Sequence, residues 1–258
     1  MINKPFLLID EKRCRRNISD MYNKALKNNL IFRPHFKTHQ SLEIGRWFRS
    51  VGVDRITVSS FSMAEYFSEE WNDITVAFPV NIGEIDLINK LARKIKLNIL
   101  IENCESVVFL NENLRHPVVF FIKIDVGYHR TGIDPNNTDL IDEILSLSAV
   151  GGMLKFSGFL THAGHTYRCR CRDEVLEIHR KSQSIMACLR KHYIDKYPSM
   201  IISIGDTPSC SLAENFDGID EIRPGNFVFY DLSQYNIGSC SIDQIAITLS
   251  CPIVSKHP

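Results

Sequence analysis

Lys37 lies among other basic side chains in the segment RPHFKTH at residues 33–39, which follows an apolar run typical of a β-strand. Partial burial and neighbouring cations both lower the pKa of a lysine, because each disfavours the ammonium form. A lysine with a lowered pKa carries more free amine, which can attack an aldehyde and form a Schiff base. The segment therefore predicts covalent chemistry at Lys37. The alternative is a surface lysine at the end of a strand, since lysines are rarely buried.

Four other apolar runs end abruptly in glycine and polar residues. They lie at residues 123–132 (KIDVGYHRTG), 158–167 (GFLTHAGHTY), 203–209 (SIGDTPS) and 221–226 (EIRPGN). In a barrel of parallel strands, such a change marks the point where a strand passes into a functional loop at its carboxyl end. Together with the end at Lys37, these segments predict five strand ends that converge on a single site.

In this order, the five segments resemble those of the D-threonine aldolase and D-serine dehydratase family, whose barrel is similar to that of alanine racemase. The resemblance runs from LLID at residues 7–10 to FYD at residues 229–231, nearly the whole chain. It implies an α/β fold, a (β/α)8 TIM barrel of the alanine racemase N-terminal type, with pyridoxal 5'-phosphate (PLP) as cofactor. Lys37 would form the Schiff base with PLP and later act as a base on one face of the substrate.

The resemblance also assigns roles to two arginines. Arg130 matches the arginine of the pattern Asp-x-Gly-x-x-Arg-x-Gly, which lies near the phenolic oxygen of PLP, where a guanidinium keeps that oxygen anionic. Arg223 matches the arginine beside the ring nitrogen of PLP in alanine racemase. The alternatives are an ion pair of Arg130 with Asp125 or Glu102, and a purely structural role of Arg223 in the turn that follows it.

His162, His165 and Tyr167 lie at the end of the sixth predicted strand. A neutral imidazole offers one donor and one acceptor, so one histidine could contact the pyridine ring and the other a substrate hydroxyl. We therefore predict that both histidines are catalytic and that His162 and Tyr167 contact the cofactor. The alternative is that the histidines are ordinary structural groups.

Two glycine-containing turns are candidates for binding the cofactor's phosphate. The predicted residues are Gly205, Thr207 and Ser209 in the first turn, and Gly225 and Asn226 in the second. Both turns can present N–H groups to an anion, and phosphate sites in such barrels commonly follow strands 7 and 8. The alternative is ordinary turn chemistry of glycine, aspartate and proline.

Strands and helices are predicted to alternate along the chain, as parallel βαβ units require. The strand-like runs lie at residues 31–36, 55–59, 74–80, 97–102, 118–126, 156–162, 200–204 and 219–223. The helical patterns lie at residues 14–29, 40–50, 63–71, 82–94, 106–113, 138–148 and 173–193. Eight strands favour a closed barrel, for which roughly 250 residues are typical. The main alternative is an open doubly wound sheet, but no Gly-x-Gly-x-x-Gly turn follows the first strand.

Composition excludes several classes of function. Lys plus Arg equal Asp plus Glu at 30 each, so no bulk charge attracts nucleic acid or a membrane. The apolar runs are far shorter than the roughly 20 residues of a membrane span, and no leader is recognised. The eight cysteines are scattered, so we expect them to be reduced and the protein to be cytoplasmic. Cys169 and Cys171 form one close pair, too few ligands for structural zinc.

The carboxyl-terminal residues are predicted to leave the barrel. We expect residues 1–238 to form the PLP-binding barrel and residues 239–258 to hold the first strand of a β-rich second domain. The resemblance implies zinc or manganese bound by residues further along in longer family members, so no metal ligand is predicted in this chain. It also implies a homodimer in the full-length form, in which the second domain of one subunit completes the site of its partner.

The leading hypothesis is a PLP-dependent lyase acting on a D-β-hydroxy amino acid, as a D-threonine aldolase or a D-serine dehydratase. We expect the chain to bind PLP and an amino acid but to have little turnover without the second domain. The alternatives are a PLP-dependent amino acid racemase and a non-catalytic PLP-binding protein of cofactor homeostasis.

Overall fold

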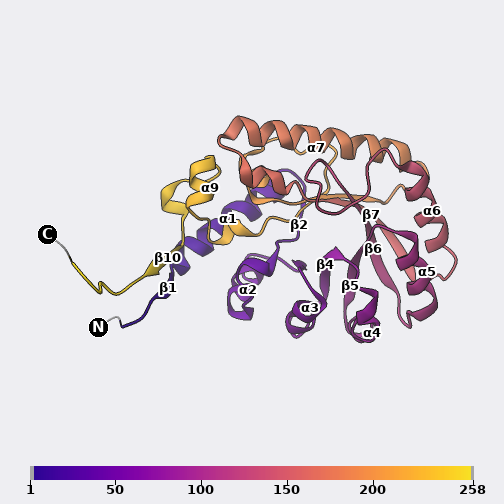
Figure 1. Ribbon diagram of the computed structural model, residues 1–258, viewed down its shortest axis with the longest axis horizontal. Helices are drawn as coiled ribbons and strands as arrows, with labels where there is room; N and C mark the ends of the chain where they lie inside the picture. The colour runs from indigo at the N-terminus through magenta and orange to yellow at the C-terminus, as the bar shows by residue number, and fades with distance from the viewer. Residues whose placement is uncertain (1–2, 257–258) are drawn as a thin grey trace.

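Eight parallel strands curl around a common axis in the computed structural model, which describes residues 3–256 (Figure 1). Their order in the sheet is β2-β9-β8-β7-β6-β5-β4-β3. A parallel bridge between His35 and Thr57 joins the two ends of this sheet. The strands are β2 (Ile31–Phe32), β3 (Ile56–Val58), β4 (Asp73–Pro79), β5 (Lys96–Ile101), β6 (Val118–Ile124), β7 (Leu154–Thr161), β8 (Ile201–Ile204) and β9 (Glu221–Ile222).

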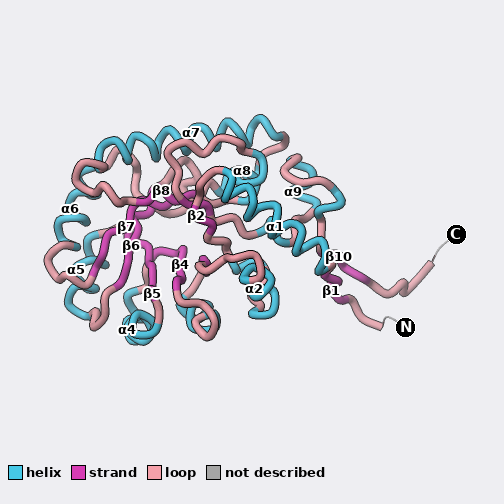
Figure 2. The backbone as a smooth tube through the Cα atoms, turned by 180° about the vertical axis from the view of Figure 1, so that it is seen from behind, coloured by secondary structure: helices cyan, strands magenta, loops and turns pink. Residues whose placement is uncertain are grey.

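Helices cover the outside of the sheet, as both views of the backbone show (Figure 2). They are α1 (Glu11–Lys27), α2 (Leu42–Arg49), α3 (Phe61–Phe67), α4 (Ile85–Lys94), α5 (Cys104–Asn113), α6 (Thr138–Ser148), α7 (Arg172–Tyr193), α8 (Thr207–Leu212) and α9 (Leu232–Ile237). Asp, Ser or Asn side chains cap most of their amino ends, for example Ser41 at α2 and Asp206 at α8. Apolar faces of these helices pack on the strands and form one large core. None of the helices among residues 3–256 combines the length and apolar character needed to cross a bilayer.

The predicted (β/α)8 architecture is confirmed, and α6 has the predicted bounds. Two strand predictions are too long. The runs at residues 31–36 and 219–223 contain only the two-residue strands β2 and β9, which pair with each other. Each is followed by an Arg-Pro pair, at Pro34 and Pro224, and proline has no N–H to donate to the ladder. Lys37 therefore lies not on a strand but in the 3-10 turn η1 (Phe36–Thr38) that follows.

Charged side chains fill part of the barrel interior. The Arg33 guanidinium donates to Glu221 at 2.7 Å and to Asp73 at 2.5 Å, and Arg33 and Glu221 are almost fully buried. Ser203 Oγ donates to the other Glu221 oxygen at 2.6 Å and accepts from Arg223 Nε at 2.7 Å. These hydrogen bonds connect Arg33 through Glu221 and Ser203 to Arg223 and so fix the position of the Arg223 side chain.

Residues 239–256 contain η5 (Ile242–Gln244) and the strand β10 (Ile247–Ser250). β10 pairs antiparallel with β1 (Phe6–Ile9), from Phe6 opposite Ser250 to Ile9 opposite Ile247. The two strands project from the side of the barrel and expose Leu7 and Leu249 (Figure 1). The expected strand of this region is thus partnered by the amino-terminal segment, and the division at residue 238 stays a prediction.

Candidate active site

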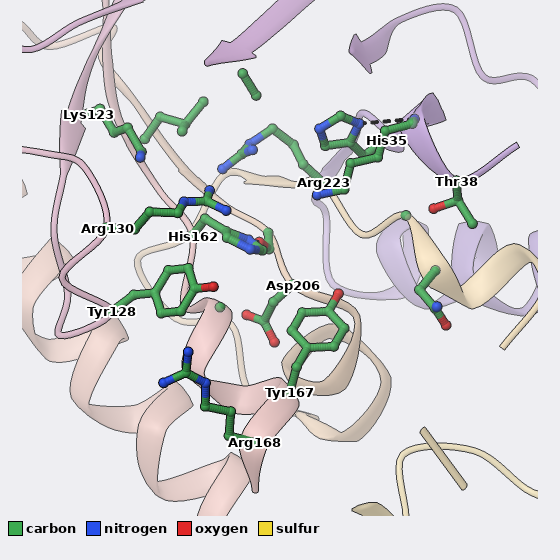
Figure 3. Close-up of a pocket in the computed structure, with 17 residues that line it drawn as sticks. His35, Thr38, Lys123, Tyr128, Arg130, His162, Tyr167, Arg168, Asp206 and Arg223 are labelled. Atoms are coloured by element: carbon green, nitrogen blue, oxygen red, sulfur yellow. Dashed lines mark hydrogen bonds between the residues drawn. The ribbon is translucent and has the colours of Figure 1, made fainter. Parts of the chain in front are cut away.

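A cavity of about 370 Å³ opens where the carboxyl ends of the strands meet their loops (Figure 3). The residues that line it come from segments far apart in the sequence, as convergent barrel loops require. Eight of the eleven predicted site residues lie on its wall: Lys37, Arg130, His162, Tyr167, Gly205, Arg223, Gly225 and Asn226. The structure therefore brings all five predicted strand ends to one place.

Three predicted residues lie behind the wall. Thr207 is buried, and its Oγ1 accepts a hydrogen bond from Gly225 N at 3.3 Å, which ties the two glycine turns together. Ser209 is also buried, and its hydroxyl has no partner among the described residues. The ring of His165 stacks on Tyr128 with centroids 6.1 Å apart. Each of the three contacts a residue that lines the cavity: Thr207 contacts Gly225, the Ser209 N–H donates to Asp206, and His165 contacts Tyr128. Their predicted roles toward a ligand stay predictions.

Several cavity residues were missed by the sequence reasoning. They include His35, Thr38, Lys123, Tyr128, Arg168 and Asp206. Five of them lie inside segments that the sequence had singled out, so the signal was present, but other residues of those segments were chosen. Arg168 directly follows such a segment.

Lys37 is positioned by the turn that follows β2. The backbone N–H of Lys37 donates to His35 Nδ1 at 3.3 Å, and His35 N donates to Pro224 O at 2.8 Å. Solvent reaches the Lys37 side chain, yet its surroundings lower its pKa, first through burial of the amine and then through the nearby Arg130 and Arg223. This agrees with the reason for which the sequence predicted a reactive amine there.

Lys123, on β6, is a second lysine of the cavity and is only 5% exposed. Its Nζ donates to Thr131 O at 3.2 Å. Burial lowers its pKa to about 8, with Arg130 and Arg223 adding to the effect and Glu102 opposing it. Two lysines with a lowered pKa thus line one cavity, and labelling can show which of them reacts with an aldehyde.

His162 is held in one tautomer. Its Nδ1 is hydrogen-bonded to the carbonyl oxygen of Gly205. Because a carbonyl oxygen can only accept, Nδ1 carries the proton and donates it, and Nε2 is left as an acceptor. Burial lowers the pKa of His162 to about 3, and Lys37 and Arg223 add to this effect. His162 is therefore neutral near neutral pH, and its Nε2 can accept a hydrogen bond from a hydroxyl group.

Arg130 and Tyr128 belong to the loop after β6. Asp125 Oδ1 accepts hydrogen bonds from Gly127 N and Tyr128 N, both at 3.0 Å, and fixes the loop. The guanidinium carbon of Arg130 lies 5.1 Å from the centroid of the Tyr128 ring. Within residues 3–256, no ion pair joins Arg130 to Asp125 or Glu102, so the structural alternative for Arg130 lacks its expected partner.

Arg223 and Asp206 are buried at the inner end of the cavity. Arg223 donates to Ser203 Oγ at 2.7 Å and to Thr161 O at 2.6 Å. Burial lowers its pKa to about 10, although Glu221 raises it. Asp206 accepts from Ser209 N at 2.8 Å and from Thr166 Oγ1 at 2.9 Å, and burial raises its pKa.

The cavity suits a dianionic aldehyde such as PLP. Five cationic side chains line it, namely Lys37, Lys123, Arg130, Arg168 and Arg223, against the single carboxyl of Asp206. Gly225 has no room for a side chain, because a Cβ there would lie 2.8 Å from His35 O. The buried hydroxyl of Ser209 lies in the first of the two turns that were predicted to bind the phosphate. No group of three or more His, Cys, Asp or Glu residues within residues 3–256 is arranged to hold a metal ion.

The depressed pKa of His162 predicts how stability depends on pH. An unfolded histidine takes up a proton near pH 6.5, whereas folded His162 resists protonation down to about pH 3. Stability is therefore lost as pH falls below 6.5, at up to about 1.4 kcal/mol per pH unit from this residue. His162→Gln should reduce this slope in urea denaturation between pH 7.5 and 5.5. His192→Gln, on the exposed face of α7, should leave it unchanged, and an unchanged slope in both variants would contradict the assignment.

The sequence profile of the alanine racemase N-terminal domain matches residues 9–233, which carry every residue of the cavity. The chain belongs to this family. The resemblance recognised from the sequence is thereby confirmed. The membership accounts for the barrel and for the position of the cavity at its strand ends.

Two curated relatives of this alanine racemase-like chain are dehydratases. It is 31% identical to the D-serine dehydratase of Dictyostelium discoideum, over 100% of this chain and 70% of that protein. It is 27% identical to the D-threo-3-hydroxyaspartate dehydratase of Delftia sp. (strain HT23), over 99% of this chain and 69% of that protein. The chain thus spans about two thirds of the length of these relatives.

Solved structures agree with this placement. The Delftia D-threo-3-hydroxyaspartate dehydratase superposes with a TM-score of 0.90 at 26% identity, over 96% of this chain and 67% of that one. The D-threonine aldolase of Filomicrobium marinum superposes with a TM-score of 0.82 at 19% identity, over 92% of this chain and 65% of that one. At that identity the second likeness shows the fold alone.

Proposed function

We propose that this chain is the PLP-binding barrel of a lyase that acts on D-3-hydroxy amino acids. The observation that carries the proposal is the position of Lys37 on the wall of a cavity lined by four other basic side chains, where burial and the nearby Arg130 and Arg223 lower its pKa. The relatives supply the substrate class, since both curated dehydratases are named for D-3-hydroxy amino acids.

When bound, PLP would supply an electron sink for negative charge at the substrate's Cα. Lys37 would hold it covalently through Nζ, and Arg130 and Arg223 would lie beside its ring. The phosphate would be bound by the two glycine turns, because such turns present N–H donors to anions. Thr207 and Ser209 belong to the first turn and Asn226 to the second.

The chain's own residues would hold and move the reacting protons. Lys37 Nζ would take the proton from Cα once its amine is free, and His162 Nε2 would accept a hydrogen bond from the 3-hydroxyl group and orient it. Removal of the Cα proton and loss of the hydroxyl as water form a Cα–Cβ double bond, which is the dehydratase outcome. Removal of the hydroxyl proton with cleavage of the Cα–Cβ bond releases an aldehyde, which is the aldolase outcome.

A divalent cation would also take part in the reaction. One solved structure of a D-threo-3-hydroxyaspartate dehydratase variant is described as metal-free, which implies a metal in that enzyme. We propose zinc or manganese, which would assist loss of the hydroxyl group. We further propose a homodimer, and a cytoplasmic location because all eight cysteines are free.

The test uses the chain loaded with PLP and the two enantiomers of serine. We expect D-serine to change the absorbance of the cofactor, because its amine competes with Lys37, and L-serine to have little effect. Pyruvate and ammonia from D-serine, and glycine and acetaldehyde from D-threonine, are measured in parallel with added zinc or manganese. We expect these products to form slowly.

A response to L-serine as strong as that to D-serine would contradict the proposal. PLP bound at Lys37 with no response to any amino acid would instead support the non-catalytic alternative. Conversion of one alanine or serine enantiomer to the other, without elimination, would support the racemase.

A further inference from the structure

Loss of the 3-hydroxyl group as water needs a proton for the departing oxygen, and neither Lys37 nor His162 supplies it. Lys37 takes a proton from Cα, and the Nε2 atom of neutral His162 has a lone pair but no proton. Tyr128 also lines the cavity and has no role so far. Its phenol gives up a proton more readily than the aliphatic hydroxyl of Thr38, the other cavity hydroxyl without a role.

The ring of Tyr128 is held on several sides. It meets His162 edge to face with centroids 6.0 Å apart, and it stacks on His165 with centroids 6.1 Å apart. The guanidinium carbon of Arg130 lies 5.1 Å from the ring centroid. A Cβ on Gly164 would overlap the ring, so the tyrosine packs directly on that turn. The ring therefore has little freedom to turn out of the cavity.

The backbone that carries Tyr128 is fixed as well. Asp125 Oδ1 accepts a hydrogen bond from Tyr128 N at 3.0 Å and from His129 N at 3.1 Å. His129 has a φ of 54°, a left-handed conformation that is uncommon for residues other than glycine. Such conformations persist where the surrounding contacts impose them, and they are frequent at functional sites. The loop thus presents Tyr128 in one defined position.

The hydroxyl of Tyr128 is a free donor in the cavity. The side chain is half-buried, yet within residues 3–256 no hydrogen bond uses this hydroxyl. Figure 3 shows it pointing into the cavity, between His162 and Asp206. His162 offers a free acceptor at Nε2, so Tyr128 and His162 together can bind a ligand hydroxyl, which accepts one hydrogen bond and donates another.

The amine that reacts with the cofactor lies near this pair. Besides burial, Arg130 has the largest effect on the pKa of Lys37, and Lys37 adds to the lowering of the pKa of His162. Arg130 in turn lies over the Tyr128 ring. A substrate amine that takes the place of Lys37 is separated from the 3-hydroxyl group only by Cα and Cβ. The 3-hydroxyl group would therefore lie between Tyr128 and His162.

We propose that Tyr128 is the acid of the dehydratase reaction and supplies the proton with which the 3-hydroxyl group leaves as water. Lys37 Nζ takes the Cα proton, and the electrons of the Cα–H bond form the double bond. The Cβ–O bond breaks with its electron pair on oxygen, which receives the Tyr128 proton. Arg130 attracts the charge left on the phenol oxygen. Solvent then returns a proton to Tyr128 and takes one from Lys37.

This inference rests on the proposed function, and its first test is a binding measurement. D-serine and D-alanine, which differ by the 3-hydroxyl group, are titrated into the PLP-loaded protein, and cofactor absorbance is recorded before product accumulates. Tyr128→Phe removes only the phenol oxygen. It should weaken binding of D-serine roughly 2- to 10-fold, as expected for one neutral hydrogen bond, and leave binding of D-alanine and retention of PLP unchanged.

The second test compares D-serine with 3-chloro-D-alanine, because chloride leaves without a proton. Pyruvate release is measured for both with added zinc or manganese. Tyr128→Phe should lower release from D-serine by roughly 10²-fold or more, the usual contribution of an acid, and leave release from 3-chloro-D-alanine nearly unchanged. Tyr235→Phe is the matched control, since Tyr235 is an exposed tyrosine of α9 outside the cavity, and it should change neither.

Several results would overturn the proposal. Equal losses of affinity for D-serine and D-alanine, or weaker retention of PLP in Tyr128→Phe, would place the hydroxyl at another group of the substrate or at the cofactor. Unchanged binding of D-serine, or equal falls in pyruvate release from both substrates, would also reject it. Unchanged release from D-serine would mean that the metal alone assists the departure of the hydroxyl group.

Failure of the proposed function looks different. The unaltered protein would then respond to neither D-serine nor D-alanine, or release pyruvate from neither D-serine nor 3-chloro-D-alanine, and both proposals would fall. A response to D-alanine, and pyruvate from 3-chloro-D-alanine, without any effect of Tyr128→Phe on D-serine would reject the role of Tyr128 alone.

Discussion

Lys37→Ala is expected to abolish covalent attachment of PLP and to lower cofactor affinity by at least about 100-fold, or about 2.7 kcal/mol. The reason is that the covalent bond between Lys37 and the cofactor would be lost, and only the noncovalent contacts with the charged side chains would hold the cofactor in the cavity. Any turnover of D-serine should fall by roughly 10²- to 10⁴-fold, since the group that moves the Cα proton is removed. Retention of PLP after gel filtration and pyruvate release measure the two effects.

Two further variants test whether the amine of Lys37, rather than its positive charge or the other cavity lysine, binds the cofactor. Lys37→Arg keeps a cation at the same position but offers no free amine near neutral pH, so it should lose the covalent link as Lys37→Ala does. Lys123→Met removes the other cavity lysine and should leave the link at Lys37 intact. Full cofactor retention in Lys37→Arg would contradict the assigned role.

Arg33→Met is expected to destabilise the fold by about 3–5 kcal/mol, because it leaves a buried carboxylate without its partner. Glu221 is fully buried and Asp73 is mostly so, and both depend on the Arg33 guanidinium. Burial raises the pKa of Asp73, but Arg33 outweighs this and brings its pKa below the usual value. Asp73 thus stabilises the fold above the pKa of an unfolded aspartate and loses this contribution as pH falls. Urea denaturation of both proteins at pH 7.5 and 4.5 measures the change.

Arg55→Met provides the matched control, since Arg55 pairs with the exposed Asp54. It should cost less than about 1 kcal/mol, as is usual for surface ion pairs. Adding Glu221→Gln to Arg33→Met should recover part of the loss, because the unpaired charge is gone. A cost for Arg33→Met as small as that for Arg55→Met would mean that the interior charges do not hold the barrel.

The barrel could be predicted because its strands and helices repeat a pattern that periodicity reveals. The bounds of α6 and the carboxyl ends of most strands follow from apolar runs that stop at polar residues. The short strands β2 and β9 could not be read in this way, since the runs assigned to them continue past the ladder into Arg33 and Arg223, which are charged yet buried. The Arg-Pro pairs at Pro34 and Pro224 were the available signal, and it is a signal about hydrogen bonding rather than about hydrophobicity.

The site was predictable to the extent that its residues lie at strand ends. Lys37 and His162 were found at the ends of strand-like runs, and Arg130 and Arg223 were found through the family resemblance of their segments. Lys123 could not be found, because the burial of its amine and its contact with Thr131 O are visible only in three dimensions. The Thr207 hydroxyl also accepts from Gly225 N and so joins two turns, a contact that its sequence neighbours do not reveal.

The central claim is that Lys37, and not its neighbour Lys123, is the residue that binds PLP covalently. The protein is incubated with PLP, reduced with sodium borohydride, digested and mapped by mass spectrometry. The account predicts one modified peptide, labelled at Lys37, with Lys123 unmodified. A label at Lys123 or at another lysine, or no label after saturating incubation, would contradict it.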